Sequence, residues 1–265
     1  MTEEPFFHVD GDQFVPTLLC QGPWDPGSAH GGPPSALLTR AIERHDPDDS
    51  LVIARVILDL VRPVPLAPLR ITTTTTRPGR RVQLVEATMT AADGTELVRA
   101  RALRVRRVPD DTAPAAPAVE PPPFAGPDRS LAVDEDENAP RAGIMQGVEL
   151  RPVSGAFRRP GPATGWFRLV APLVEDEEPS PVQRAMVAAD FGNGISQVLG
   201  DGFVFINPDL VVHFEREPVG EWVALAATTR LTPGHAALAT GTLYDTTGRI
   251  GQSEQSLYVG PRPSA

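Results

Sequence analysis

The chain contains no lysine and a single cysteine. All 24 of its basic residues are arginine, so Schiff-base chemistry and a lysine nucleophile are excluded. One cysteine cannot form an internal disulfide or a multi-cysteine metal site, and the apolar neighbours of Cys20, Leu18 and Leu19, favour a buried thiol. Redox chemistry is therefore not expected of this protein.

Long hydrophobic runs are also missing. No apolar segment approaches the roughly 20 residues that a membrane-spanning helix requires. The first five residues are acidic, whereas a secretory signal is basic and then apolar. A net charge of −10 argues against nucleic acid as the main partner. With 265 residues, 41% of them hydrophobic, the composition predicts a globular cytoplasmic protein with no membrane partner.

Proline is abundant at one place in the chain, and this divides the sequence. Residues 108–141 combine repeated prolines with an acidic run at 134–137, and repeated proline is incompatible with a helix or a central strand. We therefore predict an N-terminal lobe over residues 1–107, a linker over 108–141, and a C-terminal lobe over 142–265.

The two sides of this linker share one plan of predicted elements. Before it we expect a helix at 35–44 and strands at 51–60, 69–76, 81–90 and 96–105. After it we expect a strand at 165–173, a helix opening at Ser180 and Pro181, and strands at 203–214, 222–229, 236–244 and 250–259. The halves match in order, which indicates an internal repeat.

Proline and glycine spacing supports the repeat. Pro63 and Gly94 lie 31 positions apart, and Pro218 and Gly248 lie 30 apart; each proline ends a predicted strand and each glycine turns a hairpin. Five consecutive threonines at 72–76 favour a sheet over a helix. The sequence therefore predicts an α+β fold of two lobes, each a long helix wrapped by a curled antiparallel sheet.

Two glycines precede the first predicted helix. Gly31 and Gly32 carry no Cβ, so a ligand can approach their backbone N–H groups, which lie at the positive end of the helix. This arrangement can hold a developing oxyanion.

An ordered set of short motifs carries a family resemblance. The motifs are Trp24-Asp25-Pro26, His30-Gly31-Gly32, Arg62-Pro63, Arg77-Pro78-Gly79-Arg80, Ala189-Asp190, Asn207-Pro208-Asp209 and Ser253-Glu254-Gln255. Together they resemble the double-hotdog acyl-CoA thioesterases, close to the acyl-CoA thioesterase II family. The resemblance implies a tandem hotdog fold and hydrolysis of acyl-CoA to the free acid and CoA, with no metal and no bound cofactor.

Three residues of the second half are implied as catalytic. In the family an aspartate, a threonine and a glutamine orient and activate the attacking water. By position the aspartate is Asp190 and the glutamine is Gln255, whereas the threonine position falls on Asn207, a departure from the family pattern. A thioester needs little beyond a positioned water, a base and an oxyanion donor, although Asp190 also fits a simple helix cap.

The remaining site predictions concern the thioester oxygen and coenzyme A. The resemblance assigns the oxyanion contacts to Gly31 and Gly32, with His30 in support. The phosphates of coenzyme A call for arginine, for which Arg77, Arg80 and Arg81 form one candidate cluster, and a second is Arg158 with Arg159. An acidic acyl carrier protein could use the same residues.

Two other functions stay open. One is a non-catalytic hotdog protein that binds acyl-CoA as a sensor or carrier, which the Asn207 departure favours. The other is an enoyl-thioester hydratase, which needs an aspartate and a histidine close together, and the sequence offers no such pair on a helix start. Pairing of the chain into a homo-oligomer is a further open point.

Overall fold

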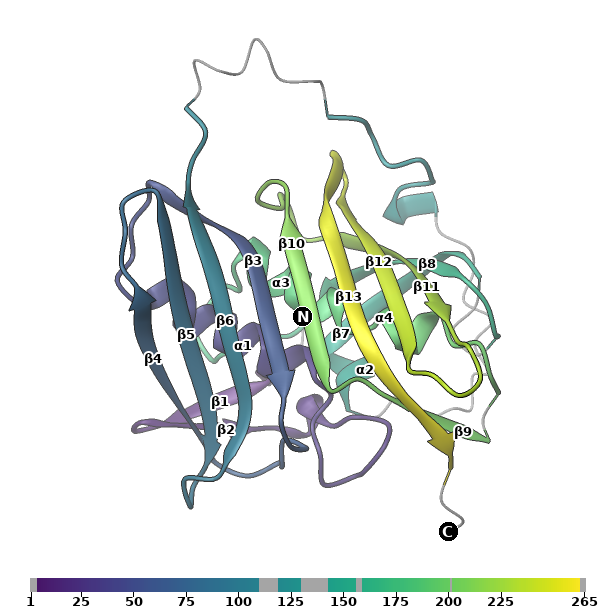
Figure 1. The fold of residues 1–265 in the computed structure, drawn as a ribbon, viewed down its shortest axis with the longest axis horizontal. Coiled ribbons are helices and arrows are strands. Elements are labelled where there is room, and N and C mark those ends of the chain that lie inside the picture. The colour runs from purple at the N-terminus through teal and green to yellow at the C-terminus, as the bar shows by residue number, and fades with distance from the viewer. Residues whose placement is uncertain (1–3, 110–118, 130–142, 156–158, 201, 263–265) are drawn as a thin grey trace.

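The protein was analysed as a computed structural model that describes residues 4–109, 119–129, 143–155, 159–200 and 202–262. One large antiparallel sheet faces the viewer in Figure 1, and helices α1 (Gly32–Arg44) and α3 (Pro181–Ala189) lie behind it. The predicted acidic run at 134–137 and Arg158 fall outside the described residues.

The sheet is ordered symmetrically about its centre. Its order is β1-β2-β4-β5-β6-β3-β10-β13-β12-β11-β8-β7, and β9 pairs with β13 beside this path. The strands are β1 (Phe7–Asp10), β2 (Gln13–Pro16), β3 (Leu51–Leu60), β4 (Leu69–Arg77), β5 (Val82–Ala91), β6 (Glu96–Arg106), β7 (Val148–Ser154), β8 (Ala163–Leu169), β9 (Phe203–Ile206), β10 (Asp209–Phe214), β11 (Val223–Arg230), β12 (Ala237–Asp245) and β13 (Gly248–Pro261). The halves meet where β3 pairs with β10.

The first helix begins earlier than the sequence predicted. We expected it from residue 35, but α1 begins at Gly32 because Pro33 and Pro34 occupy its first turn, where proline costs no hydrogen bond. Helix α3 begins as predicted, with Pro181 at its first position and the Ser180 hydroxyl accepting a hydrogen bond from Gln183 N–H. The described residues also form the short helices α2 (Ile144–Gly147), α4 (Gly192–Ile195), η1 (Leu18–Cys20) and η3 (Pro127–Arg129).

The predicted strand at 203–214 is wrong as a single element. It is broken into β9 and β10, with Asn207 and Pro208 between them. Proline has no N–H to give to a neighbouring strand, so the ladder stops there, and the carbonyl of Pro208 instead accepts a hydrogen bond from Leu60 N–H at the end of β3. The break leaves the Asn207 side chain free to point away from the ladder.

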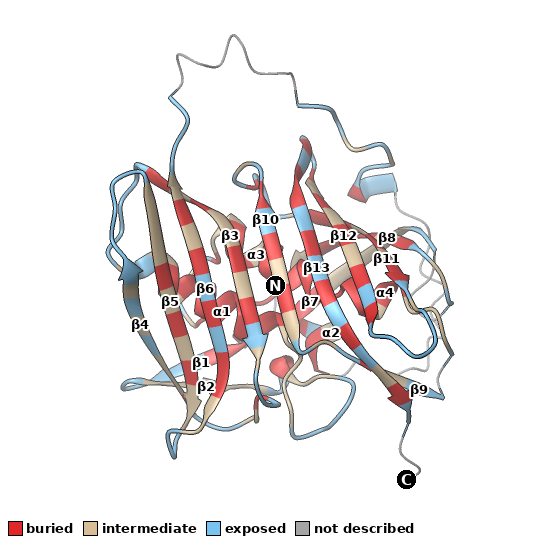
Figure 2. Ribbon diagram, in the orientation of Figure 1, coloured by how far each residue is buried: buried red, intermediate tan, exposed pale blue. Residues whose placement is uncertain are grey.

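Burial alternates along the strands, as the striping in Figure 2 shows. On β13 the side chains of Ser253, Gln255 and Leu257 are buried, whereas those of Glu254 and Ser256 are exposed. A strand exposes alternate residues to opposite faces, so Gln255 lies with Ser253 and Leu257 on the face covered by the helices. One apolar core runs between the sheet and the two helices.

Residues 119–129, inside the predicted linker, pack on the C-terminal half. The Trp166 indole N–H donates to the Ala125 carbonyl at 2.8 Å, and the Phe124 ring lies edge-on to Trp166 and Tyr244. The described part of this proline-rich segment therefore covers Trp166 and Tyr244 through the half-buried Phe124 ring.

Cys20 is buried, as the sequence predicted. Its thiol lies 3.1 Å from the carbonyl oxygen of Phe6, and burial raises the pKa of the thiol far above its usual range.

Candidate active site

Helix α3 ends at a buried carboxylate. Asp190 is the C-cap residue of α3 and only 5% of its surface is exposed. Around it lie His30, Asn193, Asn207 and Gln255, and we call these five residues the Asp190 cluster. A buried carboxylate without partners is strongly disfavoured, so the groups around Asp190 decide what it can do.

One oxygen of Asp190 is held by two amide groups. Asn207 Nδ2 donates to Asp190 Oδ1 at 2.9 Å, and Gln255 Nε2 donates to the same oxygen at 3.2 Å. Gln255 is itself fixed, because Asn193 N–H donates to its Oε1 at 3.0 Å. A Cβ on Gly192 would lie 2.8 Å from that oxygen, so only glycine allows the approach.

The other oxygen of Asp190 faces the start of α1. His30 Nδ1 lies 3.0 Å from Asp190 Oδ2. A Cβ built on Gly31 would lie 2.8 Å from the same oxygen, which explains why glycine stands there. The carboxylate from the C-terminal half therefore touches the helix start of the N-terminal half.

His30 has two neighbours for one nitrogen. Gly32 N–H donates to His30 Nδ1 at 3.1 Å, while Asp190 Oδ2 lies 3.0 Å from the same atom. A ring nitrogen either carries a proton and donates or is bare and accepts, so these two hydrogen bonds exclude each other. When Nδ1 donates to Asp190, the Gly32 N–H is released.

The first turn of α1 has few backbone N–H donors. Pro33 and Pro34 have no N–H, so Gly31 and Gly32 supply the amide donors of this first turn. The two glycines were predicted as equal oxyanion contacts, but in the structure the Gly32 N–H already donates to His30.

The structure brings six predicted residues together: Asp190, Gln255, Asn207, His30, Gly31 and Gly32. The contact between His30 and Asp190 was not predicted. The two residues are 160 positions apart, whereas the aspartate and histidine pair considered for a hydratase lies on a single helix start. Only their shared proximity to helix starts and ends could have signalled the contact.

Aromatic side chains close the inner side of the cluster. The His30 ring lies 4.6 Å from the Phe191 ring, and Phe191 lies 4.8 Å from Phe167. Both phenylalanines are buried. This stack keeps the imidazole in position and excludes water from behind it.

The predicted arginine cluster lies away from the Asp190 cluster. Arg77, Arg80 and Arg81 are exposed, and the Arg81 carbonyl accepts from Arg106 N–H, beside the first residue of β3. Asn207 lies at the other end of β3, about 30 Å away at 3.3 Å per residue. Arg159, from the second candidate pair, is exposed.

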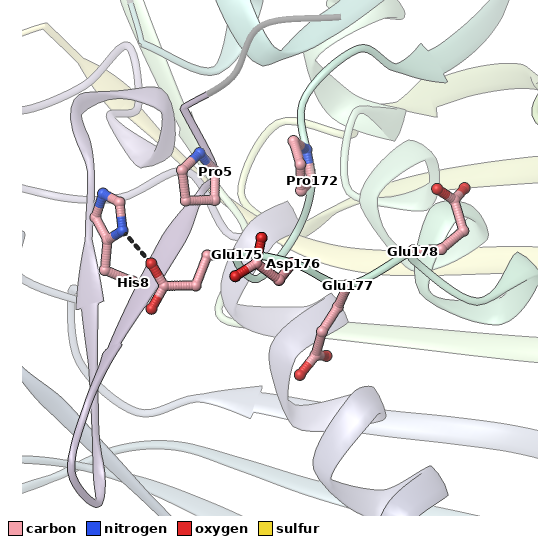
Figure 3. A pocket seen from close by; sticks show the side chains of 7 residues that line it. All are labelled: Pro5, His8, Pro172, Glu175, Asp176, Glu177 and Glu178. Atoms are coloured by element: carbon pink, nitrogen blue, oxygen red, sulfur yellow. Dashed lines mark hydrogen bonds and ion pairs between the residues drawn. The ribbon is translucent and has the colours of Figure 1, made fainter.

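An acidic pocket of about 470 Å³ lies elsewhere on the surface. Figure 3 shows its lining, in which His8 contacts Glu175 and three further carboxylates lie along the same segment. Of these, Glu177 is paired with Arg40 and Arg44 of α1. The pocket residues are Pro5, His8, Pro172, Glu175, Asp176, Glu177 and Glu178. Such a lining repels phosphate groups, so this pocket does not suit a coenzyme A thioester.

The described residues contain neither a candidate metal site nor a candidate membrane-spanning helix. They contain no cluster of three or more histidine, cysteine, aspartate or glutamate side chains placed to hold a metal ion. Within the same residues, no helix has both the length and the apolar character needed to cross a bilayer.

Comparison with solved structures identifies similar folds. A protein from Thermobifida fusca, provisionally assigned as a thioesterase II, matches with a TM-score of 0.74 at 19% identity, covering 96% of this chain and 94% of that one. Acyl-CoA thioesterase II of Mycobacterium marinum gives 0.67 at 14% identity, with 97% and 95% covered. A hot dog fold protein from Alicyclobacillus acidocaldarius gives 0.69 at 17%, with 97% and 96% covered. No curated protein matches.

Family models account for nearly the whole chain. The model of the acyl-CoA thioesterase N-terminal domain matches residues 20–105, and that of the acyl-CoA thioesterase C-terminal domain matches residues 114–259. The second match alone spans more than half of the sequence. The chain belongs to the acyl-CoA thioesterase family and is a thioester hydrolase of hotdog type.

Proposed function

We propose that this protein hydrolyses acyl-CoA thioesters with a water molecule activated by Asp190. We further propose that residues 1–107 and 142–265 form tandem hotdog lobes, joined by 108–141. The symmetrical strand order supports this arrangement. The helices α1 and α3 support it too, because each one ends beside the start of the other. The active site then needs both lobes, since Asp190 comes from one and Gly31 from the other.

The proposed reaction begins with Asp190 as the base. Its Oδ1 is occupied by the amides of Asn207 and Gln255, so Oδ2 is the oxygen that takes a proton from water. The hydroxide oxygen bonds to the thioester carbon, and the C–S bond then breaks. The electron pair leaves with sulfur, and the proton on Asp190 passes to the thiolate, which restores the carboxylate and yields the acid and CoA.

The oxyanion is stabilised at the start of α1. Gly31 N–H is one donor, and Gly32 N–H becomes a second when His30 Nδ1 carries a proton and turns to Asp190. His30 is thus proposed as a positioning residue that couples the carboxylate to the oxyanion donors. Asn207 replaces the family's threonine by donating through its amide.

One observation carries the proposal: Asp190 is buried between two amide donors and the glycine pair of the opposite helix start. The test is release of free thiol from acyl-CoAs running from acetyl to palmitoyl. Asp190→Asn keeps the size of the side chain but cannot take a proton, so kcat should fall by about 10²–10⁴. Asp190→Ala should fall at least as far.

The same assay separates hydrolysis from binding alone. A parent protein that binds acyl-CoA tightly, with no thiol release from any chain length, would be a sensor or carrier and would refute the hydrolase mechanism proposed here. Unchanged kcat in Asp190→Asn would remove Asp190 from the mechanism.

A second candidate function is hydration of an enoyl thioester. The 3.0 Å contact between His30 and Asp190 favours it, because hydration needs a general acid and a general base on one substrate. Loss of the conjugated double bond from an enoyl-CoA, without thiol release, would identify a hydratase. Release of thiol from saturated acyl-CoAs would favour the hydrolase.

The carrier of the acyl group is part of the proposal. The family name indicates coenzyme A, and acyl carrier protein is the alternative. The assignment of Arg77, Arg80 and Arg81 to the phosphates of coenzyme A stays a prediction.

A further inference from the structure

Three segments that end on the Asp190 cluster also meet at the surface. The loop after Gln21 carries Trp24 and leads to His30; β9 carries Phe203 and leads to Asn207; β13 carries Gln255 and leads to Arg262. In Figure 1 the ends of β9 and β13 lie together at the lower edge of the molecule. We call Trp24, Phe203 and Arg262 the rim.

The rim residues are joined to one another. The Arg262 guanidinium lies 5.7 Å from the centre of the Trp24 ring. Arg262 N–H donates to the Gly202 carbonyl at 2.8 Å, and Pro261 pairs with Phe203. The rim therefore combines an aromatic face, a cation and an apolar edge, drawn from both halves of the chain.

The Trp24 loop is built to hold its shape. Gly22 N–H donates to the Ser28 carbonyl at 2.9 Å, and His30 N–H donates to the Cys20 carbonyl at 2.8 Å. The exposed Asp25 carboxylate accepts hydrogen bonds from Gly27 N–H and the Ser28 hydroxyl within the same loop. The loop fixes the position of Trp24 relative to His30.

Both large apolar side chains of the rim are exposed. Trp24 is 39% exposed and Phe203 is 40% exposed. Exposed aromatic rings beside an active site are characteristic of ligand contacts. An indole face stacks with a nucleobase, and a guanidinium binds phosphate. Neither the stacking contact nor the phosphate contact requires an acidic side chain.

We propose that the rim binds the adenine nucleotide of coenzyme A, with the adenine on the Trp24 ring and a phosphate at Arg262. This rests on the proposed function, because it requires a coenzyme A thioester at Asp190. Arg262 directly follows β13, seven residues after Gln255, which is about 24 Å at 3.4 Å per residue. A nucleotide site should lie at such a distance from the thioester, since the pantetheine arm separates the two.

The first test compares acyl-CoA with acyl-pantetheine, which lacks the nucleotide. Trp24→Ala should raise KM for acyl-CoA about tenfold and leave kcat and KM for acyl-pantetheine unchanged. Trp24→Phe keeps an aromatic face and should restore most of the affinity. Arg262→Gln should raise KM for acyl-CoA alone, whereas Arg249→Gln, at the opposite end of β13, should leave it unchanged. Arg80→Gln and Arg81→Gln test the rival assignment of the phosphates to that arginine cluster.

The second test needs no turnover. Adenosine 3′,5′-bisphosphate should quench tryptophan fluorescence in the parent protein, and the quenching should be lost in Trp24→Phe. Trp166, bonded to the Ala125 carbonyl, and Trp222, beneath Arg151 and Arg168, remain as unquenched emitters in both proteins.

Each outcome decides the proposal. Equal effects of Trp24→Ala on both substrates, quenching that survives in Trp24→Phe, or a KM effect confined to Arg80 and Arg81 would overturn it. Hydrolysis of acyl carrier protein thioesters with no quenching by the nucleotide would also overturn it. If no thioester is hydrolysed at all, the proposed function fails, while the quenching result still decides whether the rim binds the nucleotide.

Discussion

The two ends of the α1 and α3 helix pair hold carboxylates in opposite circumstances. At one end Asp190 of α3 faces the start of α1; at the other Glu43 of α1 faces the start of α3. Ser180 donates to Glu43 Oε1 at 2.7 Å and Gln183 donates to Glu43 Oε2 at 2.6 Å. Each oxygen of Glu43 accepts a hydrogen bond from a residue at the start of α3, whereas Asp190 Oδ2 lies beside Gly31 and competes with the Gly32 N–H for His30 Nδ1.

The starts of α1 and α3 also differ in how their backbone N–H groups are capped. Ser180 caps α3 with its own hydroxyl, which uses the Gln183 N–H. Gly31, the N-cap of α1, has no side chain to do this. Buried Arg104 fills the Glu43 end further, donating to the carbonyls of Ile42 and His45. The glycine N–H groups at the Asp190 end fit the catalytic role proposed for it, whereas the hydrogen bonds at the Glu43 end hold the two helices together.

Among the variants that test this comparison, the largest expected effect comes from adding one methyl group at the Asp190 end. In Gly31→Ala the new Cβ would lie 2.8 Å from Asp190 Oδ2, although the backbone φ of −65° suits alanine. The carboxylate must shift, and misplacement of about 1 Å costs about 100-fold in kcat. Thiol release measures this. Gly27→Ala, whose nearest neighbours lie at 3.7 Å or more, is the matched control; equal kcat in both variants would contradict the arrangement.

A smaller effect should follow from removing one donor to Asp190. Asn207→Ala loses the 2.9 Å hydrogen bond to Oδ1 and leaves Gln255 as the remaining amide donor. A hydrogen bond to a charged group contributes about 1.5–3 kcal/mol, so kcat should fall about tenfold or more. Asn207→Thr, which brings in the family's hydroxyl, should recover most of the rate. A threonine variant as slow as the alanine variant would show that the amide itself is required.

The smallest effect concerns the Glu43 end. Burial raises the pKa of Glu43 above its ordinary value, although its bonds to Gln183 and Ser180 and the nearby Arg104 act against this, and Glu217 adds to it. The folded protein thus holds a proton that the unfolded chain has released, and stability falls as pH rises from the ordinary glutamate pKa to the raised one.

Glu43→Gln removes that loss. The melting temperature of the variant should therefore rise relative to that of the parent as pH rises from 4 to 7, with kcat unchanged. Differential scanning calorimetry at several pH values gives the comparison, and parallel melting curves for the two proteins would show that Glu43 does not titrate in this range.

Local signals in the sequence were enough for most of the fold. Pro63 with Gly94 and Pro218 with Gly248 marked equivalent strand ends and hairpins in both halves, because proline and glycine act through their own backbone. The face that Gln255 shares with Ser253 and Leu257 followed from simple alternation on β13.

The rest depended on contacts between distant segments. The strand break at Pro208 was misread because the apolar residues on either side of it continue the strand pattern. The contact of His30 with Asp190 joins residues 160 positions apart, and no local periodicity reports it. The cover formed by residues 119–129 was missed because a proline-rich composition hides the single anchoring ring of Phe124.

The burial of Cys20 has a practical outcome for every assay described above. The chain has one thiol, and in the folded state that sulfur is enclosed and protonated, so it is a poor nucleophile. A disulfide dye added to the native enzyme will therefore register coenzyme A set free by turnover and nothing from the protein. One equivalent of extra colour would appear only when the N-terminal half opens, which makes the same reagent a reporter of unfolding.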